Sequence, residues 1–213
     1  MKIRIVAALV VVVALISGSA YAADQPPATT EKQLNEVMKG WYLQAEGGFM
    51  YALKSDIPNL GAGGILSIFA GYDIKDIVAV ELGLVGAFSP AYNNGTTNPS
   101  SGLVSSSLTM GIVEANVKVS YLTMQRWFFY ARVGVGASFN TPTSVNVMNG
   151  AVPGKLELPL VTPAISIAPG FEYYTNIRHF SIGLDIKAMM LPLLGGGPGS
   201  YFLTAQPYLK YTF

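Results

Sequence analysis

Few residues in this 213-residue chain could do chemistry, and nearly all of them are carboxylates, lysines and arginines. The chain has no cysteine, which excludes disulfides, thiolate zinc sites, cysteine nucleophiles and lipoprotein anchoring. Its single histidine, His179, has no metal-ligand spacing around it, so we expect no metal site and no cofactor. The chemistry left to consider is ion pairing, acid–base catalysis by paired carboxylates, and a histidine–serine pair.

Nine charged residues draw attention because each falls within a segment of alternating apolar and polar residues. They are Glu46, Glu81, Glu114, Lys118, Arg132, Glu172, Asp185, Lys187 and Lys210. In a β-strand, residues of one parity share one face, so this pattern would place all nine on the face opposite the apolar residues. What they can do therefore depends on the element that carries them.

The overall composition indicates a membrane protein. Only 12% of the residues are charged, 51% are hydrophobic and the mean hydropathy is +0.40. Such a chain has too much apolar surface to stay disordered in water. Thirteen basic residues against twelve acidic ones leave no basic excess for phosphates, so we expect no nucleic-acid partner.

The first 22 residues have the features of a secretory signal peptide. Met1–Arg4 is basic, Ile5–Ile16 is apolar but too short to span a membrane, and Ala20 and Ala22 form an A-x-A cleavage site. We expect cleavage near Ala22 and export of a mature chain that is close to neutral.

No later segment can form a spanning helix. Turn-forming residues interrupt the three longest uncharged stretches, Leu82–Val113, Val133–Gly154 and Ala188–Leu209. None can form a continuous apolar helix of about 20 residues. An exported apolar chain without spanning helices has one remaining way to cross a membrane, the closed β-barrel.

Eight segments with period-two alternation predict an all-β, eight-stranded antiparallel transmembrane up-and-down β-barrel over residues 41–213. They are Trp41–Leu53, Gly63–Tyr72, Ile77–Phe88, Ser107–Tyr121, Trp127–Phe139, Ala164–Tyr174, Phe180–Met190 and Tyr201–Phe213. A soluble β-sandwich would also alternate, but it would carry more charge on its outer face.

The connections and the aromatic residues fit this topology. Residues 73–76, 122–126 and 175–179 are short and predict periplasmic turns, whereas 89–106 and 140–163 are long and predict extracellular loops. Aromatic residues on the apolar face predict one girdle near each membrane surface. The expected periplasmic girdle holds Trp41, Tyr72, Tyr121, Trp127, Tyr173, Phe180, Tyr211 and Phe213, and the opposite girdle holds Tyr51, Phe88, Phe139 and Tyr201.

This topology turns the nine charged residues into the lumen. An eight-stranded barrel is just wide enough for side chains to fill it, and an unpaired buried ion costs several kcal/mol. Five acids and four bases are nearly balanced, so we expect a network of ion pairs that plugs the lumen. Two alternatives remain: a proton or ion path, which needs a continuous water column, and hydrolysis by paired carboxylates, which needs room for a substrate.

Two prolines interrupt the strand pattern. Pro169 and Pro207 fall in mid-strand on the outward face, and each removes one ladder N–H. Either a local bulge or gap accommodates them, or they mark a lateral opening through which an apolar ligand passes.

Residues 23–40 precede the barrel as a periplasmic segment. Thr29–Gly40 carries Leu34, Val37 and Met38 at helical spacing, between a threonine cap and a terminal glycine. We expect a short helix at the barrel mouth or, as the alternative, a linker.

The last segment resembles the terminal strand by which outer-membrane proteins are recognised by their assembly machinery. Leu209, Tyr211 and the carboxy-terminal Phe213 alternate there, and the resemblance implies that they form an assembly signal. Gly71-Tyr72-Asp73 and Gly170-Phe171-Glu172-Tyr173 also resemble the small eight-stranded outer-membrane barrels of the OmpA/OmpX/OmpW type. A fainter similarity is to the CglE-like gliding-motility barrels. The resemblance implies the outer membrane of a Gram-negative type bacterium, with outer-membrane lipids and the barrel-assembly machinery as partners.

His179 and Ser181 could be similar to the catalytic pair of outer-membrane lipid A deacylases or palmitoyltransferases, which are also eight-stranded barrels. Those enzymes need their catalytic groups at the outer leaflet, whereas His179 is expected in a periplasmic turn without an acid partner. We therefore interpret His179 as a solvated turn residue and expect no enzyme.

The function we expect is structural, adhesive or scaffolding, with the extracellular loops contacting an extracellular or envelope protein. The alternative is a narrow barrel that binds or passes small apolar molecules through a lateral opening. A lipid-modifying enzyme is the third hypothesis.

Overall fold

The computed structural model describes residues 40–55, 57, 60–75, 77–92, 104–124, 126–141, 144–149, 152–175, 177, 179–194 and 199–213. The expected signal peptide, residues 1–22, and the expected periplasmic segment up to residue 39 lie outside these residues. Within them, no helix is long and apolar enough to cross a membrane.

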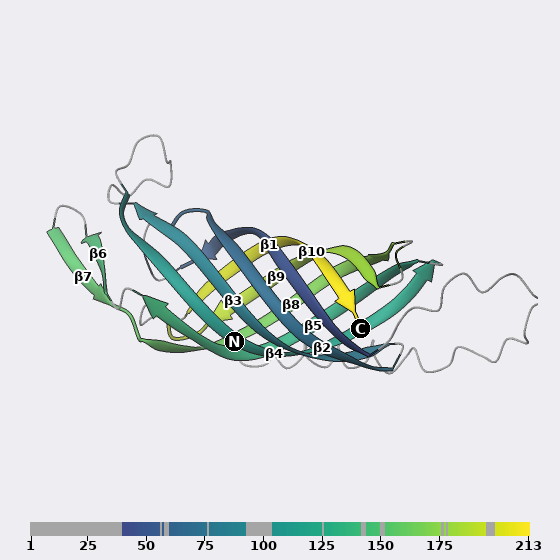
Figure 1. The fold of residues 1–213 in the computed structure, drawn as a ribbon. Helices are drawn as coiled ribbons and strands as arrows, with labels where there is room; N and C mark the ends of the chain where they lie inside the picture. Colours follow the sequence, from purple (N-terminus) through teal and green to yellow (C-terminus); the bar gives the residue numbers. More distant parts are fainter. Residues whose placement is uncertain are drawn as a thin grey trace, which may run out of the picture. The chain divides into compact units, whose positions relative to one another are not determined.

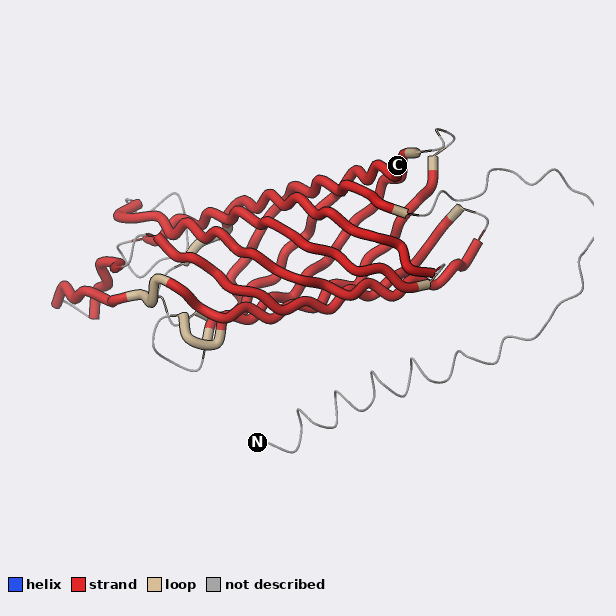
Figure 2. Tube along the Cα trace, turned by 60° about the horizontal axis from the view of Figure 1, so that its bottom comes forward, coloured by secondary structure: helices blue, strands red, loops and turns tan. Residues whose placement is uncertain are grey.

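Eight antiparallel strands close into a barrel in the order β1-β10-β9-β8-β5-β4-β3-β2 (Figures 1 and 2). They are β1 (Trp41–Lys54), β2 (Gly63–Lys75), β3 (Val78–Tyr92), β4 (Val104–Met124), β5 (Trp127–Thr141), β8 (Val161–Tyr174), β9 (Phe180–Leu191) and β10 (Ser200–Thr212). The predicted all-β, eight-stranded antiparallel barrel is therefore confirmed, and every predicted strand overlaps an observed one.

Burial alternates along the strands with the predicted parity. In β10 every second residue from Ser200 to Lys210 is buried, and the residues between them are exposed. Outward apolar side chains such as Leu82 and Leu84 are about two-thirds exposed, at 66% and 64%. An apolar outer wall with a polar interior is what a barrel in a bilayer requires, because lipid covers the outside.

The barrel closes where the first strand meets the last. Tyr42 pairs with Thr212, and the Phe213 N–H donates to the Trp41 carbonyl at 2.9 Å. The two ends of the barrel sequence therefore lie together, at the end that carries the short turns after β2, β4 and β8.

Pro169 interrupts the ladder between β8 and β9. The ladder pairs stop at Ile167 with Ala188 and resume at Gly170 with Asp185. The register is the same on both sides, so the proline produces a gap in the ladder and not a bulge.

Pro207 interrupts the ladder between β10 and β1 in the same way. The pairs stop at Glu46 with Tyr208 and resume at Phe49 with Ala205, again without a register shift. Because proline has no N–H, each gap lacks a ladder hydrogen bond. The β9–β10 hairpin thus has one interrupted ladder on each side.

The long connection after β5 contains structure that the alternation did not predict. Residues 140–163 were expected to form a loop, but β6 (Ser144–Asn149) and β7 (Val152–Glu157) form a two-stranded sheet within it. Asn149 pairs with Val152 at one end of this sheet, and Asn149 is followed by Gly150 in the sequence. An Asn-Gly step is a strong hairpin signal, because both residues tolerate the positive φ of a tight turn.

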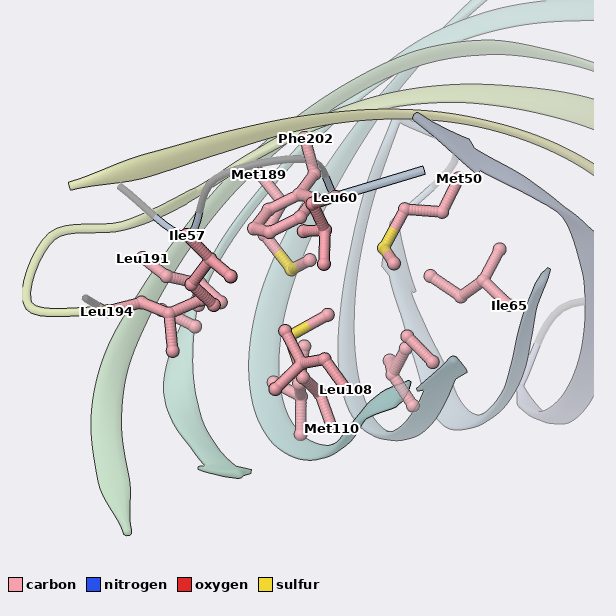
Figure 3. Close-up of a cluster of buried hydrophobic side chains, with 14 of the residues drawn as sticks. Met50, Ile57, Leu60, Ile65, Leu108, Met110, Met189, Leu191, Leu194 and Phe202 are labelled. Carbon is pink, nitrogen blue, oxygen red and sulfur yellow. The ribbon is translucent and has the colours of Figure 1, made fainter. Parts of the chain in front are cut away.

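The hydrophobic core lies inside the barrel, toward the end that carries the long connections (Figure 3). We call this cluster the apolar cap. It comprises Met50, Ile57, Leu60, Ile65, Phe69, Val85, Ala87, Leu108, Met110, Ile112, Leu158, Ala164, Met189, Leu191, Leu194 and Phe202.

Candidate functional site

All nine charged residues predicted to face the lumen are buried inside the barrel, and none is more than 3% exposed. Along every strand that contributes to both regions, the charged residues lie nearer the short turns than the residues of the apolar cap. We call these nine residues the ionic layer. It is positioned entirely by inward parity, because each member lies on a barrel strand.

Arg132 on β5 is the centre of the first cluster. Its Nη2 lies 2.8 Å from Glu46 Oε1 on β1, and its Nη1 lies 3.1 Å from Glu81 Oε2 on β3. Nη2 also contacts Asp185 on β9. One guanidinium therefore links four strands, which an arginine can do because it presents five donors in a fixed fork.

Glu172 on β8 is the centre of the second cluster. It accepts from Lys118 Nζ at 2.7 Å and from Ser181 Oγ at 2.6 Å, and Lys210 Nζ lies 3.3 Å away. Lys210 also lies 3.6 Å from Asp73. The sequence pattern placed Asp73 in a turn, but β2 continues through it, and its carboxylate faces the lumen.

Lys187 and Glu114 form the third pair, at 2.6 Å. Ser166 and Asn116 lie 3.4 Å from the two oxygens of the same carboxylate. The structure therefore gives each of the nine charged residues at least one partner of opposite charge.

Uncharged polar residues of the same parity complete the layer. Tyr42 donates to Glu81 at 2.6 Å, Gln44 donates to Glu46 at 2.7 Å, and Tyr130 donates to Asp185. Parity alone could have placed these residues in the lumen, but it could not have named their partners.

Four aromatic rings in or beside this layer occupy space that a neighbouring glycine leaves open. A Cβ added to any of these glycines would come within 2.2–2.5 Å of the ring of its ladder partner. The pairs are Tyr42 with Gly71, Phe69 with Gly83, Tyr130 with Gly170, and Tyr208 with Gly183. The rings fit inside a narrow lumen because the facing positions have no side chain.

Three of these rings lie within 4.4 Å of a buried cation, and the fourth, Tyr208, lies 5.8 Å from Lys118 Nζ. Lys118 Nζ lies 4.0 Å from the centroid of the Tyr130 ring, and Lys210 Nζ lies 4.0 Å from that of Tyr42. The Arg132 guanidinium lies 4.4 Å from the Phe69 centroid, the closest contact to that ring. Cation–π contact adds attraction at desolvated positions, which helps to offset the cost of burying these charges.

The arrangement suits ion pairing better than catalysis. The carboxylates that converge on Arg132 are held by a guanidinium and by tyrosine hydroxyls. In the described part of the chain, no group of three or more histidine, aspartate or glutamate residues could hold a metal ion.

His179 is held by the last strand and not by Ser181. Its Nδ1 lies 2.6 Å from the Thr212 carbonyl, and its ring stacks on Tyr211 with centroids 5.5 Å apart. Ser181 donates instead to Glu172. The histidine thus joins the β8–β9 turn to the last strand, and the structure does not bring the His–Ser pair together.

The aromatic residues near the short turns face outward and form contacts with one another. Trp41 packs on Tyr72 at 5.2 Å and Trp127 on Tyr173 at 4.8 Å between ring centroids. Tyr211 lies 5.1 Å from Phe213. Leu209 and Phe213 are exposed on the same outward face, so the three residues of the expected assembly signal lie side by side on the wall.

No protein-family model matches the sequence, and no curated protein matches it either. Solved structures do resemble it. Neisserial surface protein A (NspA) superposes with a TM-score of 0.58 and 14% identity, covering 84% of this chain and 100% of that chain. The N-terminal β-barrel domain of Pseudomonas aeruginosa OprF has a TM-score of 0.43, 11% identity and coverages of 82% and 99%.

A third structure is Ail, the attachment invasion locus protein of Yersinia pestis, in complex with the heparin analogue sucrose octasulfate. Its TM-score is 0.46 and its identity 12%, with 83% of this chain and 100% of that chain covered. At these identities the likeness concerns the fold, and the superposition on NspA carries it. With its closed antiparallel wall and apolar outer face, this chain has the fold of the small eight-stranded outer-membrane β-barrels.

Proposed function

We propose that this protein is an integral outer-membrane barrel of a Gram-negative type bacterium that works as a structural or adhesive scaffold and not as an enzyme. Export by a cleaved signal peptide ending near Ala22 belongs to this proposal. The lumen is closed, and the loops after β3 and β5 make the contacts with an extracellular or envelope protein. Among the described strands, β6 and β7 pair only with each other, and free strand edges are a common means of protein contact.

The observation that carries the proposal is that two different groups of side chains fill the lumen, one after the other along the barrel. The ionic layer fills the part near the short turns, and the apolar cap fills the part near the long connections. Connecting residues take part in the cap, since Ile57, Leu60, Leu158 and Leu194 are all buried.

The polar rim of the cap is tied to the same connections. Ser89 donates to the Gly61 carbonyl at 2.7 Å, and the Asn140 amide donates to the Pro159 carbonyl at 3.0 Å. These bonds tie Gly61 and Pro159 to strand residues beside the cap and support the proposed closure.

Planar-bilayer recording of the purified barrel tests the closure. We expect no steady conductance, because both fillings would have to open for ions to pass. Steady, ion-selective current from the wild type would overturn the proposal and favour the ion path. Folding in the same preparation is verified by the mobility of the unheated protein on gels.

Protease added to intact cells tests the orientation. Cleavage is expected within 89–106 or 140–163, and the turns at 122–126 and 175–179 should be protected. The opposite pattern would reverse the assignment of the two barrel ends.

The barrel-assembly machinery and the outer-membrane lipids are the partners proposed for biogenesis. Leu209, Tyr211 and Phe213 form a continuous outward surface at the chain end, which suits recognition of the unfolded terminal strand. Deleting Phe213 should lower the amount of barrel inserted in cells far more than it lowers refolding in detergent. Normal insertion of the deleted chain in cells would contradict this role.

A second candidate function is the binding of small apolar molecules, and the composition of the cap favours it. Met50, Met110 and Met189 all point into it, and methionine side chains adapt readily to different shapes. A lateral route through the ladder gaps is less well supported, because Asp185 and Lys187 line the lumen beside them. Methyl NMR in nanodiscs with added toluene should shift these three methionines but not the outward Met190 if this function is correct.

A further inference from the structure

The outer wall of the barrel is hollowed over four strands. A depression of about 620 Å³ crosses β2, β3, β4 and β5 near the short-turn end. Its volume lies within the range of about 300–1,000 Å³ that is typical of small-molecule sites. It faces away from the lumen, because Leu82, Val117 and Val135 on its surface are all outward and exposed.

The hollow exists because small residues alternate with large ones across neighbouring strands. Ala70 on β2 pairs with Leu82 on β3, and Leu82 pairs with Ala115 on β4. The two alanine side chains are short and form the bottom of the hollow, and the longer leucine and valine side chains around them form its sides.

A second depression, of about 370 Å³, continues the hollow along the same strands toward the loops. Gly86 and Gly111 face each other there on β3 and β4, and both point outward. A Cβ at Gly111 would meet no atom within 4 Å, so the space over this glycine is open. Gly111 lies four residues from Ala115, or about 14 Å along the strand at ~3.4 Å per residue.

The chemistry of the hollow selects an uncharged, apolar occupant. The side chains that face it are alanine, valine and leucine, with Trp41 and Tyr72 at its edge near the short turns. It is continuous with the apolar wall that meets the bilayer, so whatever fills it must come from the bilayer or lie within it.

Other occupants fit less well. The chain segment just before Trp41 carries Glu31, Lys32, Glu36 and Lys39, and burying these charges at membrane depth would be costly. A second copy of the barrel would need a ridge that matches a concave surface. A flexible hydrocarbon chain adapts to the hollow without either cost.

We infer that this hollow is a binding site for one acyl chain of a phospholipid in the leaflet next to the Trp41–Tyr72 end. The inference rests on the proposed membrane insertion and orientation, which place that end in the periplasmic leaflet, where phospholipids lie. The two aromatic rings, 5.2 Å apart, stand where a lipid headgroup would meet the chain.

The two tryptophans of the chain allow a direct test in detergent micelles. Trp41 lies at the hollow, whereas Trp127 belongs to the same girdle but does not line it. A phospholipid with brominated acyl chains is titrated into two purified single-tryptophan barrels, Trp127→Phe and Trp41→Phe. We expect stoichiometric lipid to quench Trp41 strongly, and Trp127 only as lipid accumulates in the micelle.

Filling the hollow should abolish this preference. The double variant Ala70→Leu/Ala115→Leu occupies the floor, and Ala205→Leu on β10 is the matched control, an outward alanine elsewhere on the wall. In the Trp127→Phe background, Trp41 of the double variant should be quenched as weakly as Trp127 is in the Trp41→Phe barrel. Trp41 of the control should be quenched as strongly as Trp41 of the parent. Unchanged circular dichroism and gel mobility verify that the variants fold.

Several results would overturn the inference. Parallel quenching of both tryptophans, or unchanged quenching in the double variant, would show that the hollow has no selective site. A dimer that the double variant abolishes would identify a second copy as the occupant. Stronger quenching after deletion of residues 23–39 would identify that segment. Trp127 is quenched at high lipid in every case if the barrel contacts lipid, so failure of insertion is recognised separately.

Discussion

The ionic layer and the apolar cap fill one lumen with opposite chemistry. Both use inward positions of the same strands: Glu46 and Met50 lie four residues apart on β1, and Lys187 and Met189 two apart on β9. The change of chemistry takes two to four residues on β1, β3, β4 and β9, and eight residues on β8 and β10. The lumen of this barrel therefore holds specific ion pairs in one half and packed apolar side chains in the other.

The two regions constrain the fold differently. In the ionic layer each charged residue has a named partner of opposite charge, so Arg132 reaches its three carboxylates only when β1, β3 and β9 stand in one register around it. The cap contains apolar side chains that many packings could satisfy. The charges therefore specify the register, whereas the cap fills volume and receives residues from the connections.

The largest effect is expected at the centre of the ionic layer. Arg132→Ala would leave Glu46, Glu81 and Asp185 buried together without their cation. We expect a loss of about 3–5 kcal/mol in the free energy of unfolding, because removing one member of a buried ion pair leaves the other charge buried and unpaired. Urea unfolding in micelles measures the loss. Arg132→Lys keeps the charge and should lose less, and a wild-type stability for Arg132→Ala would contradict the role of the charges.

A cavity in the apolar cap should cost nearly as much without opening the lumen. Leu108 is 1% exposed, and Leu108→Ala is expected to cost about 2–5 kcal/mol. Bilayer recording should still show no current, because the ionic layer stays closed. The control is Leu84→Ala on the outer wall. Current through Leu108→Ala would show that the cap alone seals the barrel.

The ring–glycine contacts should give a smaller loss. An alanine Cβ at Gly71 would lie 2.2 Å from a carbon of the Tyr42 ring, so the ring must move. We expect Gly71→Ala to cost about 1–3 kcal/mol, as overpacking usually does. Gly111→Ala, which faces open space, should change stability by less than ~0.5 kcal/mol. Equal effects of the two substitutions in thermal unfolding would contradict this account.

The smallest effect is expected at the edge of the ionic layer. Asp73 lies 3.6 Å from Lys210, and its side chain is 16% exposed. Lys210 keeps Glu172 as a partner, so Asp73→Asn should cost at most ~1 kcal/mol, like other partly exposed pairs. Chemical unfolding in 0.1 M and 1 M salt checks this, and a loss as large as that of Arg132→Ala would place Asp73 at the centre of the network.

Much of the fold could be predicted from alternation, because lipid outside and side chains inside impose opposite chemistry on successive residues. The same parity identified the lumen charges, including those that lie far apart in sequence, such as Glu46 and Lys210. Parity is a property of one strand. It does not state how strands are staggered, so it could not predict that Glu46 and Asp185 meet at the same guanidinium.

The structure of the connections could not be predicted from alternation. Ile57 and Leu158 enter the cap from segments without alternation, and no periodic signal marks a connecting residue that folds inward. Asp73 was assigned to a turn because the pattern ends at Tyr72, although the ladder carries β2 to Lys75. The β6–β7 sheet had a local signal in the sequence, the Asn149-Gly150 step, which is typical of hairpins. The alternation of apolar and polar residues does not detect such a signal.

The pairing of β1 with β10 also dictates the order of events during biogenesis. The strand that begins at Trp41 must wait for the strand that ends at Thr212, so nearly the whole barrel sequence has to be delivered before the wall can close. Until then the growing sheet has two open edges, whose N–H and C=O groups cannot be left facing hydrocarbon. Pairing of β10 with both β1 and β9 covers the two edges together, so the wall has no open edge once this strand is in place.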